Sequence, residues 1–264
     1  MKGLKGKVAI VTGGSSGIGR ACVERLCEEG VSVTFSDINP DGTKSEKELL
    51  QKGYAVHFVL GDMANEDFCE KLVEETARKW GTIDFLVNNA FSFVSKGLDG
   101  SRDDWERVMQ VGPMAYAAMA KFAVPYMRKS QKGAIVNLSS ISAHITQPNR
   151  WTYNSAKGAV TQLTRCMAMD LAPEIRVNSI SPAWTWTGEV DKAANFDREK
   201  WDPIWGKFHL LRRLGRVEEI AGPLAFLLSD DASFITGADL FVDGGYLTMG
   251  SEGLGENSSF VGSL

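Results

Sequence analysis

The chain has 264 residues, of which 44% are hydrophobic, so it can bury the core of one large α/β domain. Its net charge of −4, with lysine and arginine scattered along the chain, argues against a nucleic-acid-binding protein. The basic start lacks the apolar segment of a signal peptide, and no apolar run approaches the length of a membrane span. We therefore expect a cytoplasmic protein that binds neither nucleic acid nor a membrane.

Short apolar runs alternate along the chain with longer segments of helical spacing. The apolar runs predict strands at 8–11, 31–35, 55–59, 85–87, 134–138, 176–180 and 240–242. The longer segments predict helices at 17–29, 41–52, 66–79, 103–129, 152–171 and 217–228. Because the strands are apolar on both faces, we predict an α/β fold, a Rossmann-like doubly wound parallel sheet with helices on both faces.

We predict a single dinucleotide-binding and catalytic domain over 1–264. Three further features of the sequence refine this prediction. Pro113 and Pro125 should bend or split the fourth predicted helix. The irregular stretch at about 184–214 is interpreted as a substrate lid, and the Gly- and Ser-rich end at about 246–264 as a tail. The four cysteines lack metal-ligand spacing, so we expect reduced thiols and no metal site.

A glycine-rich turn at 12–19 follows the first predicted strand and opens the first predicted helix. This arrangement presents backbone N–H groups and a positive helix end to a pyrophosphate. The spacing is G-x-x-x-G-x-G rather than G-x-G-x-x-G, although the glycines can fill the same roles, and an ordinary strand-to-helix turn is the alternative. The turn residues that we expect to bind the cofactor are Gly13, Ser15, Ser16, Gly17, Ile18 and Gly19.

Asp37 ends the second predicted strand, eighteen residues beyond Gly19. A carboxylate at this place can accept hydrogen bonds from the adenosine ribose and would repel a 2′-phosphate. We therefore predict NAD(H) rather than NADP(H). The alternative is that Asp37 is a turn residue before Asn39 and Pro40.

Tyr153 and Lys157 lie four residues apart in a predicted helix, which puts a phenol and an ammonium on one helix face. A phenol titrates near pH 10 in water, so it needs help to act as a base near neutrality. The positive charge of Lys157, joined by that of an oxidised nicotinamide ring, favours the phenolate. The pair predicts acid/base catalysis in a nucleotide-dependent redox reaction.

Together these motifs resemble those of the short-chain dehydrogenase/reductase family, of the single-domain type, and are compatible with a sugar dehydrogenase-like member. The matching pieces cover nearly the whole chain: 12–19, Asp62 and Met63, 88–90, Ser140, Tyr153, Lys157, 176–178, 235–237 and 242–245. The resemblance implies a homotetramer, with a contact built from the helices at 103–129 and 152–171. It also implies that Lys157 binds the nicotinamide ribose. Further cofactor contacts are implied for Asp62, Met63, Asn89, Ala90, Pro182 and Thr187.

Ser140 lies thirteen residues before Tyr153, where the family carries the serine that orients the substrate oxygen. Ser139 is the near competitor. Two positions depart from the family pattern. Phe91 stands where a glycine is usual, and Gly112 stands where many members have an asparagine that holds a water in a proton relay. The relay would then use a water held by backbone, or Gln110, or be weakened.

Five of the seven tryptophans fall between residue 151 and the end of the predicted lid. Indole rings stack on sugar or cyclitol rings, and Arg150 leaves room for an anionic substituent. We expect oxidation of a secondary or hemiacetal hydroxyl, most simply on a sugar, although the tryptophans could instead pack the lid. The predicted substrate-binding residues are Phe91, Phe93, Asn149, Arg150, Trp151, Trp184 and Trp186. The alternatives are a 3-oxoacyl thioester reductase and a non-catalytic nucleotide-binding sensor.

Overall fold

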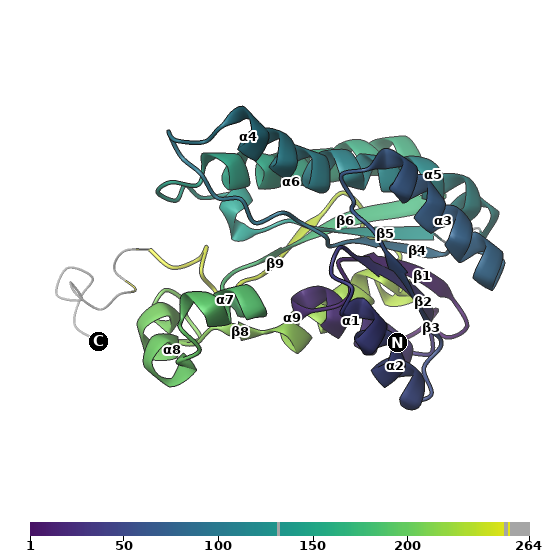
Figure 1. Ribbon diagram of the computed structural model, residues 1–264, viewed down its shortest axis with the longest axis horizontal. Coiled ribbons are helices and arrows are strands. Elements are labelled where there is room, and N and C mark those ends of the chain that lie inside the picture. The colour runs from purple at the N-terminus through teal and green to yellow at the C-terminus, as the bar shows by residue number, and fades with distance from the viewer. Residues whose placement is uncertain (131–132, 251–252, 254–264) are drawn as a thin grey trace.

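The computed structural model describes residues 1–130, 133–250 and 253, and its centre is a seven-stranded sheet (Figure 1). Every pair of neighbouring strands in this sheet is parallel. In sheet order the strands are β3 (Val56–Leu60), β2 (Ser32–Asp37), β1 (Val8–Thr12), β4 (Phe85–Asn88), β5 (Gly133–Leu138), β6 (Ile175–Pro182) and β9 (Asp239–Val242). The strand order reverses between β1 and β4, which is where open α/β sheets bind their ligands.

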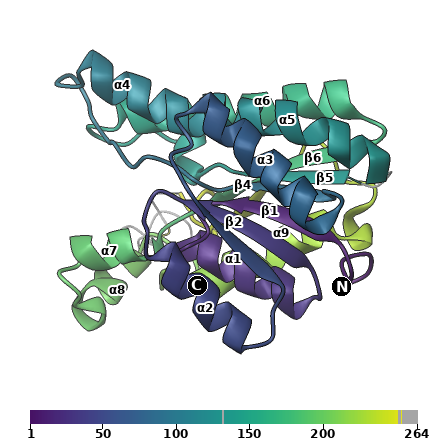
Figure 2. The ribbon, with the colours of Figure 1, turned by 45° about the vertical axis from the view of Figure 1, so that its right-hand side comes forward.

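Helices cover both faces of the sheet, which confirms the predicted Rossmann-like fold (Figures 1 and 2). One face carries α3 (Glu66–Trp80), α4 (Arg102–Met109), α5 (Ala115–Ser130) and α6 (Trp151–Leu171). The other carries α1 (Gly17–Glu28), α2 (Gly42–Gln51) and α9 (Val217–Leu228). Two short 3-10 turns, Ile141–Ala143 and Asp230–Ala232, follow β5 and α9.

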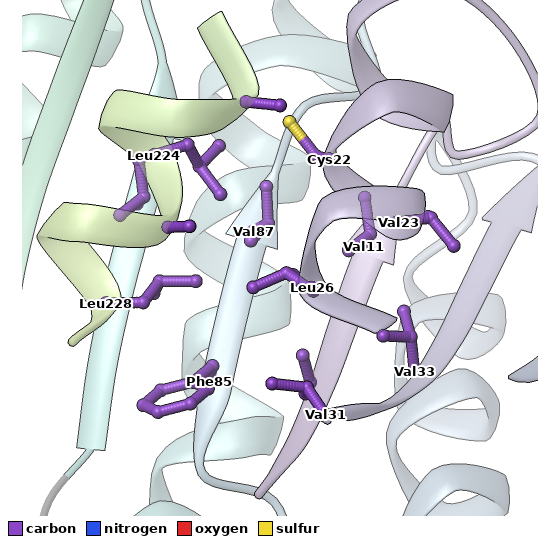
Figure 3. Close-up of a cluster of buried hydrophobic side chains, with 14 of the residues drawn as sticks. Val11, Cys22, Val23, Leu26, Val31, Val33, Phe85, Val87, Leu224 and Leu228 are labelled. Atoms are coloured by element: carbon purple, nitrogen blue, oxygen red, sulfur yellow. The ribbon is translucent and has the colours of Figure 1, made fainter. Parts of the chain in front are cut away.

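The residues of β1 show why the strands are apolar on both faces. Ala9 and Val11 join the cluster that α1 and α9 build beneath the sheet, where Leu26 and Leu224 face the strands (Figure 3). Ile10 points the other way, into the cluster formed with α3 and α5. Because each face of a strand takes alternate residues, a strand covered on both sides needs an unbroken apolar run.

The segment predicted as one helix over 103–129 is divided at the first of its two prolines. A π turn, Gln110–Met114, separates α4 from α5, and Gly112 within it has non-helical backbone angles (φ −87°, ψ −112°). Pro113 lacks the N–H that a continuous α-helix would need there. Pro125 lies inside α5, which continues to Ser130.

The predicted lid region folds into short elements that stand to one side of the sheet (Figure 1). They are β7 (Thr185–Trp186), α7 (Gly188–Ala193), α8 (Arg198–Gly206) and β8 (Gly215–Arg216), which pairs with β7. Of the predicted tail, 251–252 and 254–264 lie outside the described residues. Within the described part of the chain, no helix combines the length and the apolar character needed to cross a membrane.

Candidate active site

A cavity of about 540 Å³ opens at the carboxyl ends of the strands, beside the point where the strand order reverses. Its walls come from the glycine turn after β1, the ends of β2, β4, β5 and β6, the start of α6, and the lid. The topology alone brings these segments together, because the carboxyl ends of parallel strands meet at one edge of the sheet.

The glycine turn needs its glycines for backbone geometry and for close approach. Gly13 and Gly17 have positive φ angles of 65° and 54°, which side chains disfavour. A Cβ atom at Gly19 would lie 2.0 Å from the Gly13 carbonyl oxygen. Gly13, Ser16, Ile18 and Gly19 line the cavity, whereas Ser15 and Gly17 do not.

Side chains from β1 and β4 hold this turn in place. The Thr12 hydroxyl accepts hydrogen bonds from the backbone N–H groups of Asn89 and Ala90, both 3.0 Å away. The Asn89 side-chain amide donates to the carbonyl oxygens of Thr12 and Gly13, both at 2.9 Å. Asn89 and Ala90, two of the expected cofactor residues, thus hold the glycine turn in place and also line the cavity.

Asp37 and Asp62 stand at the end of the cavity formed by β2 and the loop after β3. Asp37 accepts a hydrogen bond from the Ser15 backbone N–H at 3.1 Å, which joins the end of β2 to the glycine turn. Asp62 accepts one from Arg107 at 2.6 Å. Burial would raise the pKa of Asp62, but the bonds from Arg107 and the Ala64 N–H lower it overall. Met63 is buried beside this pair and lines the cavity.

A dinucleotide fits the residues present. The glycine turn offers backbone donors at a helix start, and Gly13, Ser16, Ile18 and Gly19 of this turn line the cavity. Asp37 places a carboxylate at the far end of the same cavity, and a carboxylate can accept hydrogen bonds from ribose hydroxyls. No group of side chains suited to a metal ion occurs among the described residues.

Tyr153 and Ser140 meet at the other end of the cavity. Burial raises the pKa of the Tyr153 phenol, while a hydrogen bond with Ser140 and the charge of Arg150 lower it, with a net rise. The neighbouring Ser139 hydroxyl turns away towards α6, where it bonds the Thr161 hydroxyl at 2.7 Å and the Lys157 carbonyl at 3.2 Å. Of the two serines, Ser140 is the one placed against the phenol.

Lys157 is 4% exposed, and its ammonium donates to the Leu138 carbonyl oxygen at 2.8 Å. Burial lowers the pKa of Lys157 to about 7. The ammonium also lies 3.7 Å from the centroid of the Phe91 ring and 5.8 Å from that of Tyr153. The ring of Phe91 meets Tyr153 edge-on, with centroids 5.4 Å apart.

The residues predicted to bind substrate divide between the cavity and its surroundings. Phe91, Phe93, Arg150 and Trp184 line the cavity. Asn149, Trp151 and Trp186 do not. Trp151 is 54% exposed at the start of α6, and Asn149 has a left-handed φ of 56°. Trp186 is buried under the lid, where its indole N–H donates to Asp202 at 2.9 Å.

The lid tryptophans stack mainly on one another. The Trp205 ring lies 4.7 Å from that of Trp201 at an interplanar angle of 28°, and 5.2 Å from that of Trp184. With Trp186, Ala194 and Leu214 they form a small separate core. The tryptophans therefore pack the lid, as the alternative to substrate binding predicts. Trp184 and Trp205 also line the cavity.

Two predicted cofactor residues connect the sheet to the lid. Pro182 ends β6 and lines the cavity next to β9. Thr187 also lines the cavity, and its hydroxyl caps the N-terminus of α7 by accepting from the Val190 N–H. The lid is therefore attached directly to the wall of the site.

Sequence reasoning missed Arg107, Trp205 and Glu189 as lining residues. Arg107 meets Asp62 across 45 positions of sequence, so no local spacing could have indicated the contact. Trp205 was visible as one of the clustered tryptophans. Only the fold of α8 shows that it faces the cavity.

Comparisons with known proteins agree with this geometry. Over residues 13–247 the chain matches the family described as enoyl-(acyl carrier protein) reductase. It is 35% identical over 246 residues to cyclopentanol dehydrogenase of a Comamonas strain, covering 91% of this chain and 96% of that enzyme. It is 34% identical over 252 residues to glucose 1-dehydrogenase 2 of Bacillus subtilis, with coverage of 92% and 96%. The ligand-free aldohexose dehydrogenase of Thermoplasma acidophilum has a TM-score of 0.86 and 36% identity, over 94% of this chain and 96% of that one.

Proposed function

The chain belongs to the short-chain dehydrogenase/reductase family and is an oxidoreductase, and from this premise we propose an NAD-dependent dehydrogenase of a secondary or hemiacetal alcohol. The observation that carries the proposal is the meeting of Tyr153, Ser140 and Lys157 at one end of the cavity whose other end holds Asp37. A single cavity thus joins an acid/base group to a place for a dinucleotide.

The protein's own residues supply the proton chemistry. Bound NAD⁺ would accept the hydride from the carbinol carbon and bring a positive ring to the site. Ser140 orients the substrate oxygen, and Tyr153 takes the hydroxyl proton during oxidation or returns it during reduction. Lys157, when protonated, favours the phenolate and is placed to bind the ribose.

The preference for NAD(H) rests on Asp37, whose carboxylate lies in the cavity wall at the end of β2. A 2′-phosphate placed there would meet a like charge. This argument also weighs against the 3-oxoacyl thioester reductase alternative, because biosynthetic reductases of this family usually resemble NADP(H) users.

For the substrate we propose a sugar or related polar ring. Support comes from the glucose and aldohexose dehydrogenases among the similar proteins, and from polar groups beside Tyr153. Arg150 and Gln147 line the cavity there, and the Arg150 guanidinium lies 5.7 Å from the centroid of the Phe93 ring. A guanidinium in this position would favour a carboxylated sugar.

The proposed function also includes a moving lid, an oligomeric state and a cellular compartment. We propose that 184–214 closes over the substrate as a lid, and that the chain works as a cytoplasmic homotetramer. Met114, directly before α5, and Met169, on α6, are 58% and 82% exposed. These apolar side chains are suited to a subunit contact. Cys22, Cys27 and Cys69 are buried free thiols, as expected in a reducing compartment.

The test is to follow NADH formation with neutral sugars, uronic acids, polyols, cyclitols, simple cyclic alcohols and 3-hydroxyacyl thioesters, with Tyr153→Phe as the blank. Tyr126→Phe, on α5, is the matched control. We expect one sugar class to react and Tyr153→Phe to lose at least a hundredfold in rate, while still binding NADH. Reaction only with acyl thioesters would favour the reductase alternative, and tight NADH binding without any turnover would favour a sensor.

A further inference from the structure

The Lys157 ammonium contacts two groups, one at the end of β5 and one on the loop after β4. It donates to the Leu138 carbonyl at the end of β5 and rests on the Phe91 ring, 3.7 Å from its centroid. The same carbonyl accepts from the buried Tyr116 hydroxyl at 3.4 Å, so its position is fixed. An ammonium has three donors, and the Phe91 face covers a side of this one that forms no hydrogen bond with any described residue.

The Phe91 ring occupies the space that a side chain at position 112 would need. A Cβ atom built on Gly112 would lie 2.7 Å from Cε2 of Phe91, and its three nearest heavy atoms all belong to that ring. Gly112 is buried in the π turn between α4 and α5, which packs against α6. The ring is therefore clamped between this turn and Lys157.

We propose that Phe91 is a positioning residue, whose ring face holds the Lys157 ammonium against the Leu138 carbonyl, and that position 112 is glycine because the ring occupies the side-chain space. The proposal rests on the role proposed above for Lys157. Phe91 and Gly112 thus depend on each other. The large Phe91 ring, on the loop after β4, leaves no room for a side chain at position 112 on the π turn.

The physical reason lies in the burial of a cation. Removing an ammonium from water disfavours its charged form, and one carbonyl cannot replace the lost solvation. The negative face of an aromatic ring attracts a cation, most strongly where both are shielded from water. An aliphatic side chain of similar size would fill the same space without this attraction. Phe91 therefore helps Lys157 to stay charged beside Tyr153.

The first experiment titrates Lys157 directly in the cofactor-free protein. Lysine labelled with ¹³C at Cε gives an NMR signal for each side chain, and Lys157→Met identifies the one required. The titration is repeated in Phe91→Leu and in proteins with 4-fluoro-, 3,5-difluoro- or pentafluorophenylalanine at position 91. The fluorinated rings keep nearly the same shape while weakening the negative face, so each should fold even if Phe91→Leu does not.

We expect the Lys157 pKa to fall stepwise along the fluorinated series, by about one unit in total, and by a similar amount in Phe91→Leu. An unchanged Lys157 pKa across the series would overturn the proposal. Because the titration needs neither substrate nor NAD, a protein that shows the shift but oxidises no alcohol would refute the proposed function alone.

A second experiment tests the shared space. Gly112→Ala should lower the Tm of the wild-type protein because its Cβ meets the Phe91 ring, and should lower it much less in the Phe91→Leu background. Gly158→Ala is the matched control, since a Cβ there meets nothing within 4 Å. Equal losses of Tm in the two backgrounds would show that the two positions are independent and would refute this half of the proposal.

Discussion

The Asp37 carboxylate accepts a hydrogen bond from the backbone N–H of Ser15, 3.1 Å away, so the end of β2 is joined to the glycine turn. A second bond, from the Asn39 N–H at 3.0 Å, fixes the other carboxylate oxygen. The negative charge of Asp37 is therefore held at one place in the wall of the cavity. Because its position is fixed, this charge would repel the 2′-phosphate of NADP(H) at a defined place in the cavity.

Asp37→Asn should reduce the preference for NAD⁺ over NADP⁺ at least tenfold in kcat/KM, because it removes the repulsion of a 2′-phosphate and keeps one acceptor oxygen. Initial rates with both cofactors measure this. Asp41→Asn is the control, since Asp41 directly precedes α2 and its side chain forms no capping hydrogen bond. An unchanged ratio in Asp37→Asn would mean that the preference is set elsewhere.

Burial of Lys157 should make the stability of the protein depend on pH. Its pKa is about 7 when folded against 10.5 for an ordinary lysine, so between these values the unfolded chain binds more protons and stability rises with pH. Lys157→Met should therefore stabilise the protein most below pH 7, by up to about 4 kcal/mol, with the gain shrinking towards pH 10. Urea unfolding at pH 6.5 and 9.5 tests this. Lys71→Met, at an exposed site, should show no such trend.

The raised pKa of Tyr153 predicts opposite pH trends for the two directions of reaction. At neutral pH the phenol keeps its proton, which suits it to donate during reduction of a carbonyl. Oxidation needs the phenolate and should accelerate as pH rises, whereas reduction should slow. Profiles of kcat from pH 6 to 10 in both directions check the prediction. Parallel trends would indicate that another group limits the rate.

Arg150→Gln should separate substrate binding from catalysis. If the guanidinium binds a carboxylate, KM for uronic acids rises ten- to a hundredfold while KM for neutral sugars stays within about twofold. A smaller fall in kcat is expected for both classes, because the Arg150 charge also lowers the pKa of Tyr153. Arg165→Gln, exposed on α6, is the control. Equal changes in KM for both classes would argue against an anionic substrate.

Trp205→Ala should weaken the lid. The change removes the ring that stacks on Trp201 and contacts Trp184, so we expect a lower Tm and at least a tenfold rise in substrate KM, with NADH affinity unchanged. Trp151→Ala, at an exposed position outside the cavity lining, is the matched comparison. A larger effect on KM at Trp151 than at Trp205 would mean that substrate contacts α6 rather than the lid core.

Much of the site could be predicted because its motifs are local. The glycine turn follows β1 directly, and Tyr153 and Lys157 are one helical turn apart, so their geometry follows from backbone structure alone. Non-local contacts were out of reach. The partners of Arg107 and Trp205 come from distant segments, and so does Thr161, which holds the Ser139 hydroxyl against α6.

The sequence by itself determined the parallel sheet and the covering helices, because apolar periodicity and the alternation of strands with helices are properties of the chain read in one direction. It also marked Phe91 and Gly112 as two separate departures from a familiar pattern. Only the tertiary structure decided that they are one feature. The two are distant in sequence, and only folding brings the Phe91 ring into the space beside Gly112 and onto Lys157, since packing lets one side chain fill what another leaves empty.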